Sequence, residues 1–257
     1  MSQIRIIGWD AASKWRNNGI FEANYDLKEF NLKEAPKEIN VSDLKNILSC
    51  PLENTIIAID MPLAWPIAFQ KEWNSNSPRE STTCKRCPKE NRPNENIFRR
   101  KTEQWVAKEK YINPLEVTAQ PLAKAAFKTC KRLSKYFTVD WFEDVIRTNG
   151  ATSGILEVYP AASLNKSFPV TKKLPKKGSN EYKSEVQRYL SQVDPAFAPA
   201  MNKTMNHHQI DALLCIATTI QYLRKECQPP GDTICDDCLF KEGWIWVPFN
   251  NSNALNK

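Results

Sequence analysis

Two short apolar runs that each end in an aspartate constrain the fold of this chain more than any other feature. Ile4–Trp9 and Thr55–Ile59 are rich in β-branched residues, a composition that is typical of buried strands. A carboxylate follows each run directly, Asp10 in the first case and Asp60 in the second. Because ligands of open α/β sheets gather at the carboxyl ends of the strands, we expect both aspartates at a functional edge.

The other segments with apolar periodicity predict the remaining strands and helices of an α/β fold. Asn17-Asn18-Gly19 predicts a hairpin turn in which Asn and Gly adopt positive φ. We expect further strands at about 20–24, 28–32, 155–159 and 244–247, and helices at about 42–48, 102–111, 121–149 with a break, 179–192 and 206–224. Ser42 and Ser179 are the expected caps. Three strands, a helix, a strand, helices, a strand and a helix predict a mixed five-stranded sheet flanked by helices, which is the order of a ribonuclease-H-like core.

The length of 257 residues suits a single domain spanning 1–257. Two polar segments that contain cysteines, approximately 70–100 and 226–241, lack apolar periodicity and are expected to be insertion loops. We see neither a secretion signal nor an apolar run long enough to span a bilayer. Eight cysteines in such a chain indicate thiols or metal ligands in a reducing compartment, so the sequence predicts a cytoplasmic protein.

Four of the cysteines form two CxxC pairs, Cys84 with Cys87 and Cys235 with Cys238. Two such pairs supply four thiolates, which is the donor set of a tetrahedral structural zinc site. The long separation between the pairs is no obstacle if the two insertions fold together. Unbound thiols are the alternative, and Cys227 is a possible substitute ligand.

Two further acids extend the candidate site. Glu157 lies near the end of the strand predicted at 155–159, and Asp211 lies near the start of a final helix that is apolar on nearly every side. A carboxylate on a buried helix is costly unless it is paired or bound to a cation. Converging acids repel each other, and hard oxygen ligands in that number suit Mg²⁺ or Mn²⁺. Alternatively, Asp10 caps a turn, Asp60 ends a strand and Glu157 is a paired buried acid.

These acids suggest two-metal hydrolysis of a phosphodiester bond, in which one ion activates water and the other stabilises the leaving oxygen. The first strand would deliver Asp10 as the bridging ligand, while Asp60 and Asp211 complete the two coordination shells. Glu157 would bind a metal or orient water. His208, three residues before Asp211 on the same helical face, would assist the leaving group or contact phosphate, and Lys172 or Lys173 could do so instead. His208 can also merely cap or pack, and the adjacent histidine competes with it.

Basic residues favour a nucleic-acid partner. Lys and Arg number 36 against 29 Asp and Glu, which gives a net charge of +7. The excess is concentrated in Lys85–Lys101 and Lys166–Lys177, and the second segment follows the strand that bears Glu157. We therefore expect this segment to border a substrate groove, with two solvated loops as the alternative. The residues expected to contact the substrate are Lys172, Lys173, Lys176, Lys177, Arg99 and Arg100.

Other classes of protein are excluded or disfavoured. None of the 7 glycines forms GxGxxG or GxxxxGK, which excludes a dinucleotide site or P-loop of the usual kind. An actin- or sugar-kinase-like ATPase needs a Gly- and Thr-rich turn after the first strand, whereas this chain has Asp10-Ala-Ala-Ser-Lys14. Two functions remain, a metal-dependent nuclease and a non-catalytic nucleic-acid-binding module on the same core.

Six segments resemble the family called domain of unknown function 429, whose members are predicted ribonuclease-H-like nucleases. The segments are IGWDAA (7–12), IAIDMPLAWP (57–66), FRRKTEQWV (98–106), LEVYPAASL (156–164), HHQIDALLCIAT (207–218) and EGWIWVP (242–248). The resemblance implies a ribonuclease-H-type fold with Asp10, Asp60, Glu157 and Asp211 as active-site acids. His208-x-x-Asp211 is also similar to the final-helix acids of Holliday-junction-resolvase-type nucleases. The chain departs from the family at Arg100-Lys-Thr-Glu103, since the family tends to follow its arginine with an aspartate.

Overall fold

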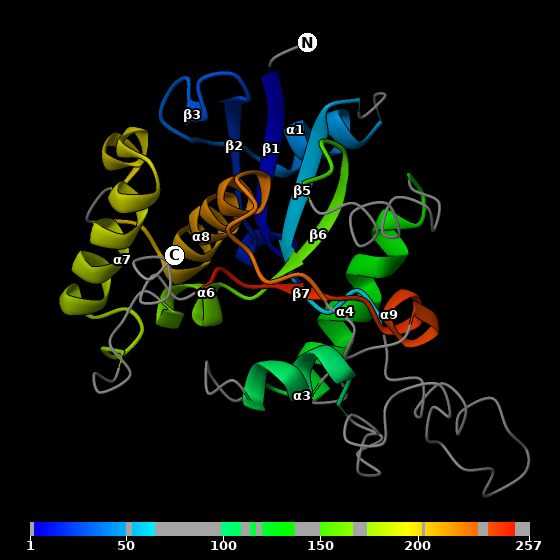
Figure 1. Cartoon of the computed structure of the whole chain (residues 1–257). Coiled ribbons are helices and arrows are strands. Elements are labelled where there is room, and N and C mark those ends of the chain that lie inside the picture. Colours follow the sequence, from blue (N-terminus) through cyan, green and yellow to red (C-terminus); the bar gives the residue numbers. More distant parts are fainter. Residues whose placement is uncertain are drawn as a thin grey trace, which may run out of the picture.

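The computed structural model of the chain shows a mixed sheet with helices on both faces (Figure 1). The residues that it describes are 3–49, 53–64, 99–108, 114–116, 120–136, 150–166, 174–201, 204–230 and 236–249. None of the helices within these ranges is both long and apolar enough to cross a bilayer.

The sheet has the strand order β3-β2-β1-β5-β6-β7, with the short strand β4 paired to β2. Its strands are β1 (Gln3–Asp10), β2 (Gly19–Asp26), β3 (Asn31–Leu32), β4 (Lys37–Glu38), β5 (Thr55–Asp60), β6 (Gly154–Val158) and β7 (Ile245–Trp246). Pairing is antiparallel from β1 through β2 to β3, and parallel from β1 through β5 and β6 to β7. This arrangement is the ribonuclease-H-like topology that the sequence predicts. The sheet has two strands more than the predicted five-stranded core. One is β4, and the other is β7, which is the short strand expected at 244–247.

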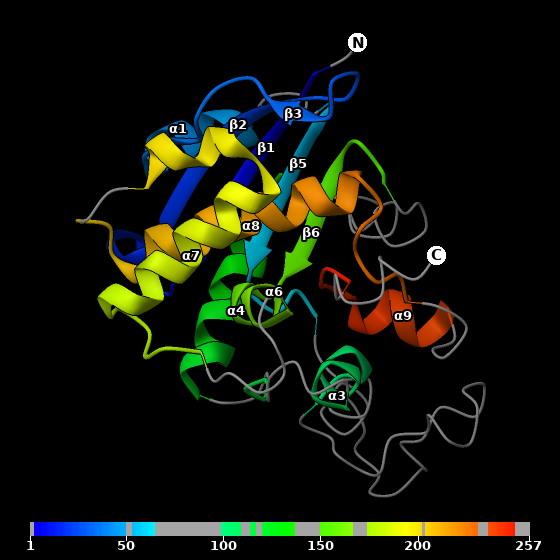
Figure 2. The same cartoon turned by 60° about the vertical axis from the view of Figure 1, so that its left-hand side comes forward.

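Helices cover the sheet on both sides (Figures 1 and 2). They are α1 (Val41–Leu48), α3 (Lys101–Lys108), α4 (Gln120–Leu133), α6 (Pro160–Lys166), α7 (Asn180–Val193), α8 (His207–Leu223) and α9 (Asp236–Glu242), with 3-10 turns at Trp15–Asn17 and Pro195–Ala200. Successive strand residues point to opposite faces of the sheet. Ile6 therefore packs in the core formed with α7 and α8, whereas Ile7 packs in the core formed with α1 and α4.

Some local predictions were wrong at element boundaries. Asn40, not Ser42, caps α1, in a reciprocal capping box with Asp43. The helix α6, which follows the strand predicted at 155–159, was not expected, and Pro160 occupies its first position, where its missing N–H costs nothing. The segment 226–241, predicted to be a loop, contains most of α9. Ser179 caps α7 as predicted.

Gly19 has a different role from the one predicted. Among the described residues, positive φ occurs at neither Gly19 nor the two residues before it, so the connection from β1 to β2 is not a positive-φ turn. Instead, α8 lies directly on the sheet: a Cβ on Gly19 would lie 2.0 Å from the carbonyl oxygen of His208, and one on Gly8 would lie 2.1 Å from that of Ala212. The two glycines allow the helix that carries His208 to pack against the end of β1.

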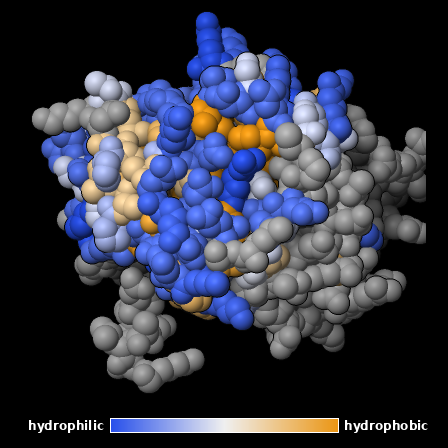
Figure 3. Space-filling model, turned by 90° about the horizontal axis from the view of Figure 1, so that it is seen from above, coloured by the Kyte–Doolittle hydropathy of each residue, from blue (hydrophilic) through white to orange (hydrophobic). Residues whose placement is uncertain are grey.

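The two ends of the sheet differ. The end at which β1 and β5 begin, seen from above in Figure 3, is largely hydrophilic in its described residues and has a small apolar patch. The carboxyl ends of β1, β5 and β6 lie at the opposite end of the molecule, where Asp10, Asp60 and Glu157 are found.

Candidate active site

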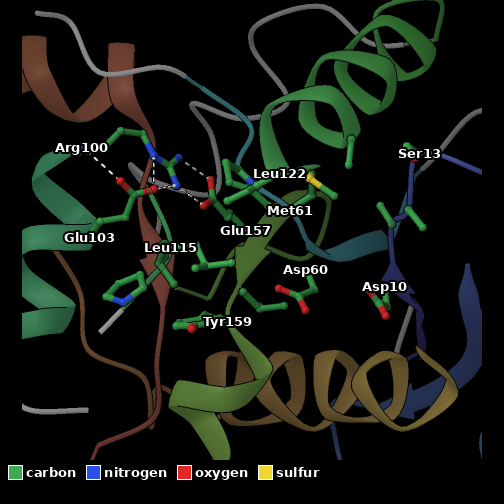
Figure 4. A pocket seen from close by; sticks show the side chains of 17 residues that line it. Asp10, Ser13, Asp60, Met61, Arg100, Glu103, Leu115, Leu122, Glu157 and Tyr159 are labelled. Atoms are coloured by element: carbon green, nitrogen blue, oxygen red, sulfur yellow. Dashed lines mark hydrogen bonds and ion pairs between the residues drawn. The ribbon is translucent and has the colours of Figure 1, made fainter. Parts of the chain in front are cut away.

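The acids of the first two parallel strands lie next to each other. Asp10 and Asp60 are register partners at the last positions of β1 and β5, and Glu157 of β6 pairs with Ile59. Figure 4 shows the carboxylates of Asp10 and Asp60 side by side above α8, while Glu157 turns away from them toward Arg100. The structure thus brings acids from three adjacent strands to one edge but does not aim all of them at one point.

Asp10 is turned toward α8. Its Oδ2 atom lies 2.6 Å from Nδ1 of His208, and because a carboxylate only accepts, the imidazole N–H donates. This hydrogen bond raises the pKa of His208 against the opposing effect of partial burial. The ring centroids of His207 and His208 are 4.0 Å apart. The pKa of His207 is shifted the opposite way, because partial desolvation lowers it, although much of its side chain faces solvent. His208 is therefore the histidine that serves the site.

Asp211 is paired with Lys177. The ammonium group of Lys177 donates to Oδ2 of Asp211, which is buried, while the lysine side chain remains half exposed. Burial raises the pKa of Asp211 to about 6, and the attraction of Lys177 opposes that rise. Burial acts to lower the pKa of Lys177, but the charge and hydrogen bond of Asp211, together with the charges of Asp60 and Asp10, raise it overall. The sequence placed Lys177 at the substrate groove without indicating this partner.

Asp60 differs from its neighbours because no hydrogen-bond donor of the described residues reaches its carboxylate. Desolvation raises the pKa of Asp60 well above its ordinary value, and the charges of Asp10 and Asp211 raise it further. The positive charge of Lys177 acts in the opposite direction and lowers the pKa of Asp60. Asp60 is therefore the acid whose ionisation is most costly without an added cation.

Glu157 forms a buried ion pair, which is the alternative that the sequence left open, although the sequence did not indicate its partner. Nη1 of Arg100 donates to Oε2 of Glu157 at 2.7 Å, and Nη2 donates to Oε1. The backbone N–H of Leu63 also donates to Oε2 at 3.1 Å. Glu157 thereby fixes the segment that follows Asp60.

Arg100 is fully buried, which corrects the substrate-binding role predicted for it. Its five N–H groups all donate to protein acceptors, namely the carboxylates of Glu103 and Glu157 and the carbonyl oxygen of Glu242. Burial acts to lower its pKa, but these carboxylates, Glu157 first, raise it overall. Glu103 is the acid that follows the arginine in this chain, and the i,i+3 spacing is the signal that identifies the pair.

Several predicted residues lie elsewhere or outside the described residues. Lys172, Lys173, Cys84, Cys87 and Cys235 are outside, as is the side chain of Cys238. Lys176 is exposed beside Lys177. Nε of Arg99 lies 3.7 Å from Oε1 of Glu116, with which it forms an ion pair. Cys227, the suggested substitute zinc ligand, is buried in the core with its thiol 3.6 Å from the carbonyl oxygen of Thr218.

A pocket of about 390 Å³ opens beside Asp10 and Asp60 (Figure 4). Its apolar wall includes Met61, Leu115, Leu122 and Ala125. Tyr159 also lines it, and burial, followed by the charge of Asp60, raises the pKa of this phenol to about 12. Tyr159 therefore keeps its proton at neutral pH and can donate a hydrogen bond into the pocket.

The carboxylates of β1, β5 and α8 fit a hard divalent cation in chemistry, because carboxylate oxygens are the ligands that Mg²⁺ and Mn²⁺ prefer. In the described residues no three His, Cys, Asp or Glu side chains converge closely enough to hold an ion as they stand. The reason is that Asp10 is turned to His208 and Asp211 to Lys177. Lys177 already neutralises part of the site, and His208 adds to this when it is protonated.

The strand order and the acids at the carboxyl edge define an α/β protein with ribonuclease-H-like topology. The chain belongs to the family described as "Protein of unknown function (DUF429)", whose model matches residues 38–233, and this confirms the membership predicted from the six segments. The matched range includes Asp60, Glu157 and Asp211, whereas Asp10 precedes it. No curated protein and no solved structure matches the sequence.

Proposed function

We propose that the chain is a metal-dependent nuclease in which Asp10, Asp60 and Asp211 hold Mg²⁺ or Mn²⁺ and phosphodiester bonds are hydrolysed. The observation that supports this most is the state of Asp60. It lies beside two other acids, has no hydrogen-bond donor among the described residues, and has a pKa raised well above its ordinary value. Such a carboxylate gains more from a bound cation than from any protein partner in its surroundings.

When bound there, divalent ions supply activation of water and neutralise charge on the leaving oxygen. The protein side chains complete this chemistry. His208 donates its Nδ1 proton to Asp10, and this hydrogen bond raises its pKa and so favours a second proton at Nε2, which it can release to a leaving oxygen. Tyr159 stays protonated and donates to a phosphate oxygen, while half-exposed Lys177 offers a positive charge to the same group.

Glu157 has a positioning role in this proposal. Its two oxygens accept from Arg100, and Oε2 also accepts from the backbone N–H of Leu63. By holding the segment after β5, Glu157 keeps Asp60 at the edge of the pocket. The metal would therefore be held by three acids rather than the four expected from the sequence.

A nucleic-acid substrate is supported by the net charge of +7 and by exposed Lys176 next to Lys177. A structural Zn²⁺ on Cys84, Cys87, Cys235 and Cys238 remains part of the proposal. Elemental analysis of protein purified without chelator should find about one zinc per chain.

The test is cleavage of labelled single-stranded, duplex and branched RNA and DNA with Mg²⁺, Mn²⁺ or EDTA. Cleavage should require a metal, and Asp10→Asn, which keeps the shape of the side chain, should reduce the rate by at least about 100-fold while binding persists. Glu34→Gln, which removes an exposed carboxylate outside the site, serves as the control. Unchanged cleavage by Asp10→Asn would assign the activity to another site. Tight binding without cleavage in either metal would favour the non-catalytic binding module.

A further inference from the structure

Helix α4 and the three residues after it contain basic residues but no acid. Residues 120–136 hold Lys124, Lys128, Lys131, Arg132 and Lys135, and neither Asp nor Glu occurs among them. The four lysines are exposed. The spacing of Lys124, Lys128 and Lys131 places them along one face of the helix within an arc of roughly 60°, and Lys135 follows in the turn after the helix. The opposite face packs Ala126 and Leu133 in the core.

An ordinary solvated helix face mixes both signs of charge, because like charges four residues apart destabilise the helix. Here Lys124 and Lys128 are four apart, as are Lys131 and Lys135, and none of the four forms an ion pair with any described residue. This uncompensated row of positive charge is complementary to a polyanion.

The same helix also forms part of the candidate site. Leu122 and Ala125 line the pocket that contains Asp10. Arg132 donates to the carbonyl oxygens of Ala12 at 3.3 Å and Ser13 at 3.4 Å, in the segment that directly follows Asp10. The row of lysines therefore lies on a helix that lines the pocket near one end and contacts pocket residues near the other.

An exposed aromatic residue lies among the lysines. Phe127 is 62% exposed, and it neighbours Lys124 and Lys131 at three and four residues along the helix. Aromatic side chains on basic surfaces stack the bases of single strands. A helix that binds a lipid surface would instead turn a whole apolar face outward, whereas the apolar face of α4 is packed against the sheet.

We propose that the α4 stripe, defined as Lys124, Phe127, Lys128, Lys131 and Lys135, binds a single-stranded nucleic acid. The lysines contact successive phosphates, and one base stacks on Phe127. The helical part of the stripe, from Lys124 to Lys131, is about 10 Å long at 1.5 Å per residue, and with Lys135 beyond it the stripe can contact about three phosphates. The inference rests on the proposed function only in that the bound strand leads to the pocket. Binding to the stripe itself needs neither a metal nor cleavage.

The experiment measures binding of fluorescein-labelled oligothymidylate and oligouridylate to the full chain in EDTA, by anisotropy over a series of NaCl concentrations. The stripe variant changes Lys124, Lys128, Lys131 and Lys135 to Gln. The control variant changes Lys28, Lys37, Lys45 and Lys225 to Gln, which are exposed lysines on other elements, so that both variants have the same net charge. Circular dichroism and thermal melting confirm that both are folded.

The stripe variant should bind at least about tenfold more weakly than the control variant, and its salt slope should fall by about two to three, because each lost phosphate contact removes about 0.7. Phe127→Ser should weaken binding about tenfold with the salt slope unchanged. Equal losses in the stripe and control variants would overturn the proposal. It would also be overturned if the stripe variant lost binding to phosphatidylserine vesicles while its oligonucleotide binding stayed intact. Because the assay contains EDTA, its outcome is independent of whether metal-dependent cleavage is found.

Discussion

The carboxylates at the sheet edge have unequal partners. Asp10 contacts His208, Asp211 contacts Lys177 and Glu157 contacts Arg100, but no described donor reaches Asp60. The folded state therefore binds a proton at Asp60 more readily than the unfolded state does, since burial and two neighbouring acids raise the pKa.

The sign of the resulting pH dependence follows from linkage. Between the ordinary pKa of an aspartate and the raised pKa of Asp60, the folded state binds more protons, so its free energy of unfolding falls as the pH rises. In EDTA, Asp60→Asn should match the wild type at acidic pH and become increasingly more stable toward neutral pH. Urea unfolding at a series of pH values measures this difference. A constant difference at all pH values would show that Asp60 ionises normally.

Arg100 gives a second prediction at the scale of single residues. Its guanidinium is fully buried between Glu103 and Glu157, so Arg100→Met leaves two carboxylates without their cation. Removing one partner of a buried ion pair costs about 3–5 kcal/mol in the free energy of unfolding. Arg188→Met, which breaks the partly exposed pair with Glu185, should cost less than about 1 kcal/mol. If urea unfolding gave equal losses for both variants, the Arg100 network would not be the stabilising contact that its geometry indicates.

At the scale of elements, the contact between α8 and the sheet sets the position of His208. Gly19→Ala would place a Cβ 2.0 Å from the carbonyl oxygen of His208, so the helix must move. We expect a loss of about 1–3 kcal/mol in the free energy of unfolding, and a pKa of His208, measured by NMR, that falls toward its ordinary value. Gly178→Ala is the comparison, since it adds strain at φ +90° but meets no atom within 4 Å. An unchanged pKa of His208 in Gly19→Ala would contradict this account.

The helices and strands that could be predicted from the sequence are those whose own residues show a clear apolar pattern. β1 and β5 have β-branched runs, and α8 has a long apolar segment, so their convergence at one edge follows from the fold class. Short elements such as α6 and α9 were missed because tertiary packing, rather than local periodicity, stabilises them. The partners of the acids were missed for a similar reason, since Arg100 and Glu157 are 57 residues apart and no local pattern connects them.

At the scale of the whole molecule, the site is the place where three separate parts of the fold meet. The sheet supplies Asp10 and Asp60, α8 supplies Asp211, and the segment before α7 supplies Lys177. The ammonium of Lys177 contacts an oxygen of Asp211 that the proposal assigns to a metal. The lysine and a divalent cation therefore compete for the same carboxylate.

This competition predicts an unusual effect of removing a lysine. Lys177→Gln should raise the affinity for Mn²⁺ about fivefold at pH 8, since two unit charges about 4 Å apart in water interact by roughly 1 kcal/mol. In the wild type the affinity should fall as the pH drops, because His208 and Asp60, whose pKa values are raised, and Asp211, with a pKa of about 6, take up protons. Isothermal titration calorimetry measures both effects, with Lys176→Gln as the control that changes an adjacent exposed lysine. Weaker Mn²⁺ binding by Lys177→Gln would mean that the lysine supports the metal site instead of competing with it.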